Sequence, residues 1–180
     1  FFEVAYGLRE KEHNEELGLI YSRLNNPDLG ILEDRLTLWD GAEDCAVFES
    51  GMSAITTLLF EFLNPGDYVV YSAPVYGGTD HFINHVLPRF GIKHVGFRAG
   101  STKEEIRARI KEVGADGKIG LIYAETPANP TNALVDIEVL REIADEHSSS
   151  EKPVYVAIDN TYMGPLWSHP LKLGADLVLY

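Results

Sequence analysis

The sequence predicts an α/β fold with a mostly parallel sheet and helices on both faces of that sheet. Short apolar runs of strand length alternate with stretches of helical periodicity from residue 29 onward. The run 153–159 is rich in β-branched residues and carries no charge before its last residue, Asp159, which is typical of a buried strand. Repeated strand–helix alternation favours parallel strands, because each helix returns the chain to the same end of the sheet.

Turn and cap residues mark where several of the expected elements begin and end. Gly41 closes a first helix with apolar residues at helical spacing, residues 64–67 are a turn, and Asp136 is placed to cap a helix. The expected helices are 29–40, 52–63, 79–87, 102–113 and 136–147. The expected strands are 45–49, 68–72, 92–97, 119–124, 153–159 and 176–180.

The chain is expected to have two parts, 1–29 and 30–180. Residues 1–29 are polar and irregular and are typical of an N-terminal arm, whereas residues 30–180 carry the regular strand–helix pattern. The sequence ends at Tyr180 within an apolar strand pattern, and domain boundaries normally lie in exposed linkers. We therefore expect a fragment that holds only the first part of its larger domain.

Composition and charge narrow the possible partners. A net charge of −13 over 180 residues, with no basic stripe, argues against a nucleic-acid partner, because Lys and Arg provide most of that affinity. No apolar run reaches the length that spans a bilayer, so we expect no membrane partner. The one cysteine, Cys45, excludes an internal disulfide and fits a reducing, cytoplasmic location.

Two strand–helix junctions carry glycines that suit a bound cofactor. The segment Ser50-Gly51-Met52 opens a helix, where backbone N–H groups and the helix dipole favour a phosphate. A tight turn would explain the same glycine. Tyr76 precedes Gly77-Gly78, so its ring has room to stack on a planar group. A tyrosine packed at the edge of the sheet is the alternative.

Two polar residues follow later strands. Asn129 lies in a loop stiffened by two prolines, where its amide suits a cofactor oxygen or a substrate carboxylate, or caps its own turn. Asp159 ends its strand at the edge where open α/β sheets bind ligands. A carboxylate there suits a cationic ring nitrogen, such as the pyridinium of pyridoxal phosphate. His81 and His85 are four residues apart, but a solvated helix face explains them and we expect no metal site.

Taken in order, six motifs resemble the pyridoxal-phosphate enzymes of Cys/Met metabolism. This family includes cystathionine γ-synthase, cystathionine γ-lyase, methionine γ-lyase and the O-acyl-homoserine sulfhydrylases. The motifs are Tyr21-Ser-Arg23 with Asn26-Pro27, the block 47–55, Tyr76-Gly-Gly-Thr79, Glu125-Thr-Pro-Ala-Asn-Pro130, Ile158-Asp-Asn160 and Leu173-Gly-Ala-Asp-Leu177. The resemblance runs from about residue 21 to residue 180. It implies the fold type I architecture of pyridoxal-phosphate-dependent transferases, here incomplete.

The resemblance implies cofactor contacts for most of the residues singled out above. Ser50, Gly51 and Met52 would bind the phosphate of pyridoxal 5′-phosphate. Asn129 would contact the ring-oxygen side of the cofactor or the substrate carboxylate, and Asp159 would pair with the protonated ring nitrogen.

The resemblance also implies a site shared between subunits. Tyr76 would stack on the pyridine ring of its own subunit, whereas Tyr21 and Arg23 would reach the phosphate bound by a neighbouring chain. Tyr21 and Tyr76 are the expected catalytic residues, with Tyr21 placed for proton transfer. A homo-oligomer, usually a tetramer built from such dimers, is therefore expected.

Some family features are missing or altered. The family's Schiff-base lysine, after a serine/threonine pair, would be expected beyond Tyr180, as would the arginine that binds the substrate carboxylate. Lys172 lies in what resembles a surface turn, so we assign it no role and expect the chain by itself to be inactive. Gly78 stands where methionine γ-lyases usually carry cysteine, and Asp80-His81 where cystathionine enzymes often carry arginine.

The resemblance thus implies a trans-sulfuration-type enzyme of sulfur amino acid metabolism. Its expected reaction is β/γ-elimination or γ-replacement on cystathionine, methionine or an O-acyl-homoserine. Another fold type I enzyme, such as an aminotransferase or a β-lyase, is the first alternative. A non-catalytic relative is the second.

Overall fold

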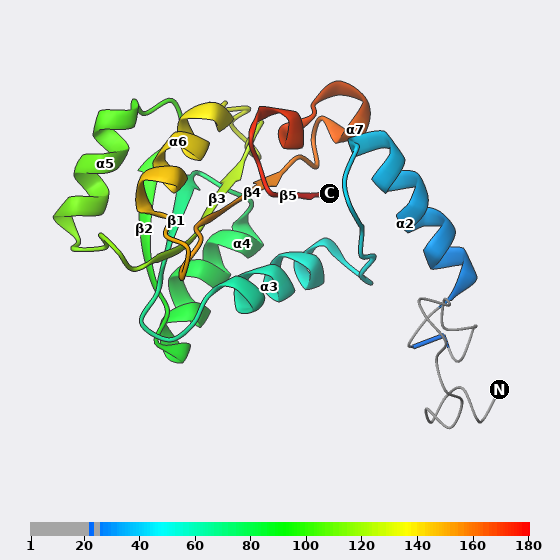
Figure 1. The fold of residues 1–180 in the computed structure, drawn as a ribbon, viewed down its shortest axis with the longest axis horizontal. Coiled ribbons are helices and arrows are strands. Elements are labelled where there is room, and N and C mark those ends of the chain that lie inside the picture. The colour runs from blue at the N-terminus through cyan, green and yellow to red at the C-terminus, as the bar shows by residue number, and fades with distance from the viewer. Residues whose placement is uncertain (1–21, 24–25) are drawn as a thin grey trace. The chain divides into compact units, whose positions relative to one another are not determined.

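The computed structural model describes residues 22–23 and 26–180 and divides the chain into two compact units, Phe1–Val47 and Phe48–Tyr180. In the first unit, α2 (Pro27–Asp40; Figure 1) begins after Asn26. The Asn26 side chain accepts a hydrogen bond from the backbone N–H of Asp28 at 2.9 Å. The helix ends at Gly41, which has the left-handed φ of 67° that favours glycine. The expected first helix and its closing glycine are confirmed.

The expected strand 45–49 is wrong. Residues 44–48 carry no regular secondary structure. The backbone N–H of Cys45 donates to Asp44 Oδ1 at 2.7 Å, and that of Val47 donates to Glu33 Oε1 at 3.0 Å. Because side chains accept from these backbone groups, they form no ladder with a neighbouring strand, and β propensity alone does not make a strand.

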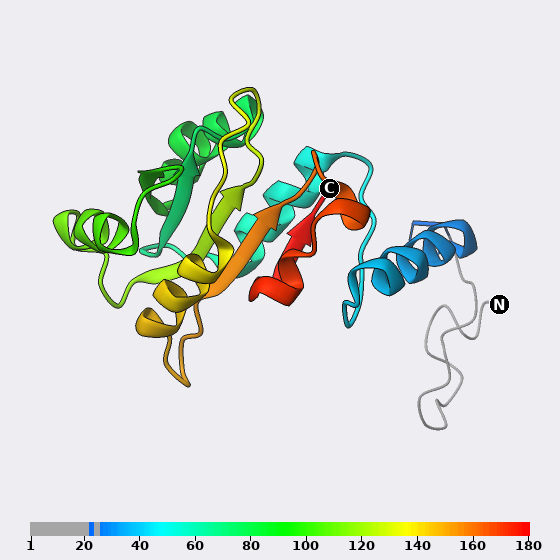
Figure 2. The same cartoon turned by 90° about the horizontal axis from the view of Figure 1, so that it is seen from above.

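The second unit is built on a five-stranded sheet in the order β2-β1-β3-β4-β5, with every pair of neighbours parallel. The strands are β1 (Tyr68–Ala73), β2 (Lys93–Arg98), β3 (Ile119–Glu125), β4 (Tyr155–Asp159) and β5 (Leu177–Leu179). Their arrowheads point toward one edge of the sheet in Figure 2. The expected α/β fold is confirmed.

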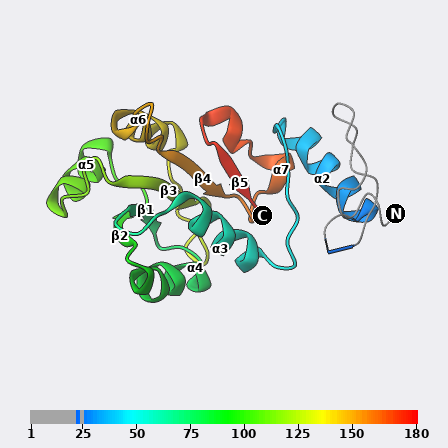
Figure 3. The same ribbon diagram turned by 60° about the horizontal axis from the view of Figure 1, so that its bottom comes forward.

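Helices cover both faces of this sheet, as expected (Figure 3). They are α3 (Gly51–Phe62), α4 (Gly77–His81), α5 (Lys103–Glu112), α6 (Ile137–His147) and α7 (Gly164–Trp167), with a π-helix η1 (Phe82–Val86) and the 3₁₀ helices η2 (Leu87–Phe90) and η3 (Pro170–Leu173). The helices α5 and α6 bury Ile110 and Leu140 against one face. On the opposite face α3 buries Leu59, and η1 buries Ile83. Among the described helices, none combines the length and apolar composition of a membrane span.

The order of the strands creates a switch point between β1 and β3. The chain leaves β1 through α4 for β2 on one side, then returns through α5 to β3 on the other side of β1. Consequently the loop after β1 turns toward the face that holds α3, and the loop after β3 turns toward the face that holds α6. In open α/β sheets such a divergence leaves a crevice at the carboxyl ends of the strands, where ligands bind.

Candidate active site

A cavity of about 490 Å³ lies at the carboxyl ends of the strands, beside the first turn of α3. Its volume is within the range of small-molecule sites. The residues that line it are Ser50, Gly51, Met52, Ile55, Tyr76, Glu125, Asn129, Asp159, Thr161, Tyr162, Leu179 and Tyr180. Six of these were expected from the sequence as cofactor contacts, and they come from four separate segments of the chain.

The first turn of α3 forms one wall of the cavity. Ser50 caps the helix by accepting a hydrogen bond from the backbone N–H of Ser53 at 3.1 Å. Gly51 and Met52 are the first two helical residues, so helix geometry provides no carbonyl partner for their N–H groups. This wall therefore offers hydrogen-bond donors and the positive end of a helix dipole to an anion.

Tyr76 lies beside this wall with its ring close to the backbone of α4. A Cβ atom added at Gly78 would lie 2.7 Å from Tyr76 Cε1 and 2.9 Å from Met52 Sδ. A larger residue at position 78 would have to displace the Tyr76 ring or the Met52 side chain, so the second glycine of the pair makes room for both. Tyr76 is 46% exposed and borders the cavity, so it is not buried at the edge of the sheet.

Asp159 ends β4 and is 5% exposed. Its Oδ1 accepts hydrogen bonds from the backbone N–H and the hydroxyl of Thr161, at 3.1 and 2.6 Å. Its Oδ2 accepts a single bond within the described chain, from the Tyr123 hydroxyl at 3.1 Å. Burial, and then the charge of Asp159, raise the pKa of Tyr123 well above its ordinary value, so Tyr123 remains a donor and Oδ2 keeps acceptor capacity toward the cavity.

Glu125 ends β3 next to Asp159 in the parallel register. Its Oε2 accepts a short hydrogen bond from the backbone N–H of Tyr76, and its Oε1 accepts one from that of Asn129 at 2.9 Å. Burial raises the pKa of Glu125, whereas the two N–H donors lower it and the nearby Asp159 raises it again. Two carboxylates therefore border the cavity, while no lysine or arginine of the described chain lines it.

The Asn129 side chain makes no hydrogen bond within the described residues, so it does not cap its own turn. Lys172 is exposed in η3 and does not line the cavity. Arg23 belongs to the first unit, which is described separately, and Tyr21 lies outside the described residues. Of the sequence-predicted contacts, the structure thus brings together those between residues 50 and 159.

Sequence reasoning missed Glu125, Tyr123 and Thr161. One signal was present for Glu125, because it ends an apolar strand on a carboxylate in the same way as Asp159. Thr161 also had a local signal, because it lies two residues after Asp159, where a turn returns its N–H and hydroxyl to that carboxylate. Tyr123 had none, since it contacts Asp159 from 36 residues away.

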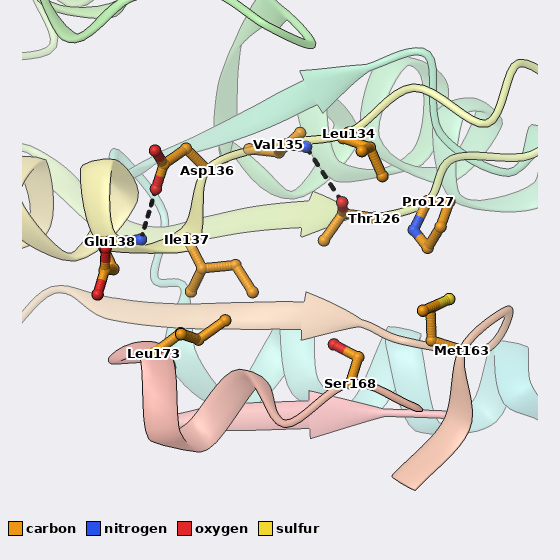
Figure 4. Close-up of a pocket in the computed structure, with 10 residues that line it drawn as sticks. All are labelled: Thr126, Pro127, Leu134, Val135, Asp136, Ile137, Glu138, Met163, Ser168 and Leu173. Atoms are coloured by element: carbon orange, nitrogen blue, oxygen red, sulfur yellow. Dashed lines mark hydrogen bonds between the residues drawn. The ribbon is translucent and has the colours of Figure 1, made fainter. Parts of the chain in front are cut away.

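A second cavity, of about 270 Å³, lies between the start of α6 and the segment from α7 to η3 (Figure 4). Two of its polar side chains accept hydrogen bonds from the local backbone. Thr126 Oγ1 accepts from the backbone N–H of Val135 at 3.1 Å, and Asp136 Oδ1 accepts from that of Glu138 at 3.1 Å. Within the part of the chain that the structure describes, no group of three or more His, Cys, Asp or Glu side chains is arranged to hold a metal ion. The cavity beside α3, which gathers the six sequence-predicted contacts, is the candidate active site.

Residues 3–180 match the family model described as Cys/Met metabolism PLP-dependent enzyme, where PLP is pyridoxal phosphate. The chain belongs to this family. L-methionine gamma-lyase of Treponema denticola is 39% identical over 166 residues, which are 92% of this chain and 39% of that protein. Human cystathionine gamma-lyase is 34% identical over 163 residues, or 91% of this chain and 38% of that protein.

Solved structures of similar proteins agree with this membership in the Cys/Met metabolism family. The metB structure from Corynebacterium glutamicum has a TM-score of 0.78 and 34% identity, with 88% of this chain and 38% of that chain covered. A putative O-acetylhomoserine (thiol)-lyase, metY, from Campylobacter jejuni has a TM-score of 0.79 and 34% identity, with 91% and 37% covered, and carries a pyridoxyl-lysine monophosphate. The chain spans about 40% of the length of the curated relatives named above. The chain is similar to a methionine gamma-lyase although it carries Gly78, so this residue does not by itself distinguish the chain from those enzymes.

Proposed function

We propose that the intact protein is a pyridoxal-phosphate-dependent enzyme of trans-sulfuration type and that the cavity beside α3 is its cofactor site. The observation that carries this proposal is the convergence of six sequence-predicted contacts on one cavity. Family membership supports the same chemistry. The cavity also fits the group: Asp159 Oδ2 has acceptor capacity for a ring N–H, and the start of α3 suits a phosphate.

The phosphate would lie at the first turn of α3. The N–H groups of Gly51 and Met52, together with the Ser50 hydroxyl, would donate hydrogen bonds to its oxygens. A phosphate also needs positive charge, and no lysine or arginine of the described chain lines the cavity. Arg23 of a neighbouring subunit would supply that charge, with Tyr21 beside it, so the working protein would be a homo-oligomer, expected to be a tetramer.

The ring would lie between α3 and the carboxyl end of β4. Tyr76 would stack on one face of the ring, and Asn129 would donate a hydrogen bond to its oxygen or to the substrate carboxylate. Asp159 would hold a proton on the ring nitrogen through Oδ2. The cofactor, when bound, supplies an electron sink for a carbanion formed on an amino acid. Tyr21 would move a proton at the reacting carbon of the substrate.

The proposed substrates are cystathionine, methionine or an O-acyl-homoserine, converted by β/γ-elimination or γ-replacement in the cytoplasm. We place the lysine that anchors the cofactor beyond Tyr180, since the chain spans about 40% of its relatives and Lys172 lies away from the cavity. The chain by itself would then be inactive.

The test compares two ligands of the cofactor-free intact protein, pyridoxal 5′-phosphate and its 1-deaza analogue, which lacks the ring nitrogen. Asp159→Asn keeps the size of the side chain and removes its charge. We expect affinity for pyridoxal phosphate to fall roughly 10- to 100-fold, the value of a hydrogen bond to a charged group. Affinity for the analogue should stay within about twofold.

Asp136→Asn is the matched control, because this carboxylate borders the second cavity and caps α6. It should bind both ligands like the wild-type protein. Equal losses for both ligands in Asp159→Asn would contradict the assignment of Asp159 to the ring nitrogen. Failure of the wild-type protein to bind pyridoxal phosphate would contradict the proposed function as a whole.

A further inference from the structure

The carboxylate of Glu125 joins two loops that the topology sends in opposite directions. Glu125 is 4% exposed at the end of β3, and its two oxygens accept from different partners, the N–H of Tyr76 and the N–H of Asn129. Tyr76 follows β1 and Asn129 follows β3. The hydrogen bond from Tyr76 therefore crosses the crevice of the switch point, whereas the one from Asn129 ties the loop after β3 to the end of its own strand.

No other hydrogen bond within the described residues joins the loop 74–76 to the loop 126–130. The nearest link is a bond from the backbone N–H of Glu125 to Ser72 Oγ at 3.1 Å, which connects the two strands rather than the two loops. Without the carboxylate, no hydrogen bond of the described residues would join the two loops, although the loop after β3 keeps a bond from the Thr126 N–H to the Asp159 carbonyl oxygen at 3.2 Å. Glu125 is thus the direct hydrogen-bonded link between the segments of Tyr76 and Asn129.

We propose that Glu125 is a positioning residue whose carboxylate holds the backbones of Tyr76 and Asn129 at a set spacing and so sets the width of the cofactor cavity. This inference rests on the proposed function, because it concerns the same cavity. Glu125 does not act as a catalytic residue, since both of its oxygens are engaged by backbone N–H groups and the side chain is almost fully buried.

The ionised carboxylate suits this task better than an amide would. Hydrogen bonds to a charged acceptor are stronger than those between neutral groups, and a carboxylate presents an acceptor oxygen to each of the two loops. Glutamine presents one acceptor oxygen and one NH₂ donor. In Glu125→Gln one of the two backbone N–H groups would therefore face another donor.

The first measurement is amide hydrogen exchange in the cofactor-free intact protein. In the wild-type protein the amides of Tyr76 and Asn129 should exchange as slowly as strand amides although they lie in loops. Glu125→Gln should speed exchange of at least one of them roughly tenfold or more, while amides in the centre of β3 keep their rates. Fast exchange of both amides in the wild-type protein would overturn the proposal without any variant.

The second measurement is the binding of pyridoxal 5′-phosphate and the visible circular dichroism of the bound cofactor, which reports its orientation. Glu125→Gln should weaken binding roughly 10- to 100-fold and reduce the dichroic signal. Ser72→Ala is the matched control, because it removes a buried hydrogen bond to Glu125 and leaves the carboxylate intact. It should lower stability without changing exchange at Tyr76 and Asn129, the affinity or the dichroism.

These outcomes separate the inference from the proposed function. Faster loop exchange with unchanged affinity and dichroism in Glu125→Gln would show a purely structural link and overturn the proposal. The same changes in Ser72→Ala would also overturn it, since general loosening would then explain them. A wild-type protein that does not bind pyridoxal phosphate would defeat the proposed function, while the exchange rates would still report whether Glu125 holds the two loops.

Discussion

Replacing Tyr123 by phenylalanine removes one hydroxyl from the centre of the candidate site and leaves the packing of the ring unchanged. Tyr123 is fully buried on β3, and its hydroxyl donates to Asp159 Oδ2 at 3.1 Å. After the substitution Oδ1 keeps its two donors from Thr161. Oδ2 loses the one hydrogen bond that it accepts within the described chain.

The expected cost follows from the charge of the acceptor. A buried hydrogen bond to a charged group contributes about 1.5–3 kcal/mol to stability, and one between neutral groups about 0.5–1.5 kcal/mol. Tyr123→Phe should therefore lower the free energy of unfolding by about 1.5–3 kcal/mol at neutral pH. In an Asp159→Asn background the same change should cost about 1 kcal/mol less, because the acceptor is then neutral.

Urea unfolding of the cofactor-free protein measures both free energies, with the slope of the transition checked for constancy. Tyr155→Phe is the matched control, since the Tyr155 hydroxyl makes no hydrogen bond within the described residues while its ring packs on Phe62 at 4.7 Å. The control should stay within about 0.5 kcal/mol of the wild-type protein. The loss of unfolding free energy in Tyr123→Phe should differ between the two backgrounds and exceed that of the control. Equal losses in both backgrounds, or a loss no larger than that of the control, would refute a hydrogen bond from Tyr123 to a charged Asp159.

Three further predictions concern the fold. Gly120→Ala should destabilise the protein by about 1–3 kcal/mol in urea unfolding, because the added Cβ would lie 2.9 Å from the main-chain oxygen of Phe62. A change in the free energy of unfolding below about 0.5 kcal/mol would argue against this close approach. Leu140→Ala should lower the free energy of unfolding by about 2–5 kcal/mol, since Leu140 is fully buried. Urea unfolding measures this loss, and a loss below that range would contradict the prediction. Burial lowers the pKa of His94 below its ordinary 6.5, so the unfolded chain takes up the proton first and stability should fall as the pH decreases below about 6.5. The loss should shrink in His94→Phe, and an unchanged pH profile of unfolding in this variant would contradict the assignment.

The ends of several helices could be predicted from the sequence, because they depend on residues that are close together in the chain. Gly41 and Asp136 end and begin their helices as expected, because a left-handed turn residue and a capping carboxylate act within a few residues of themselves. The prediction of a strand at 45–49 was wrong because a strand needs a neighbouring strand to which its backbone can hydrogen-bond. The backbone groups of this segment bond to nearby side chains instead.

The candidate site could be predicted in part for a related reason. Asp159 ends its strand, and Asn129 and Tyr76 lie in loops that follow strands. Parallel strands bring such positions to one edge of a sheet. Glu125 was missed because its importance depends on which loop lies across the crevice, and Tyr123 because its partner is on the neighbouring strand. Neither fact is encoded in residues near to them in sequence.

The sequence by itself therefore determined the strand–helix alternation, the residues at the strand ends and the family motifs, since these depend on short-range periodicity and turn chemistry. Only the tertiary structure decided the strand order β2-β1-β3-β4-β5, the switch point and the carboxylate that spans it. The physical reason is that Asp159 and Glu125 take their partners from segments 36 and 49 residues away. Such contacts form only once packing of the helices on both faces has chosen the neighbours of β3.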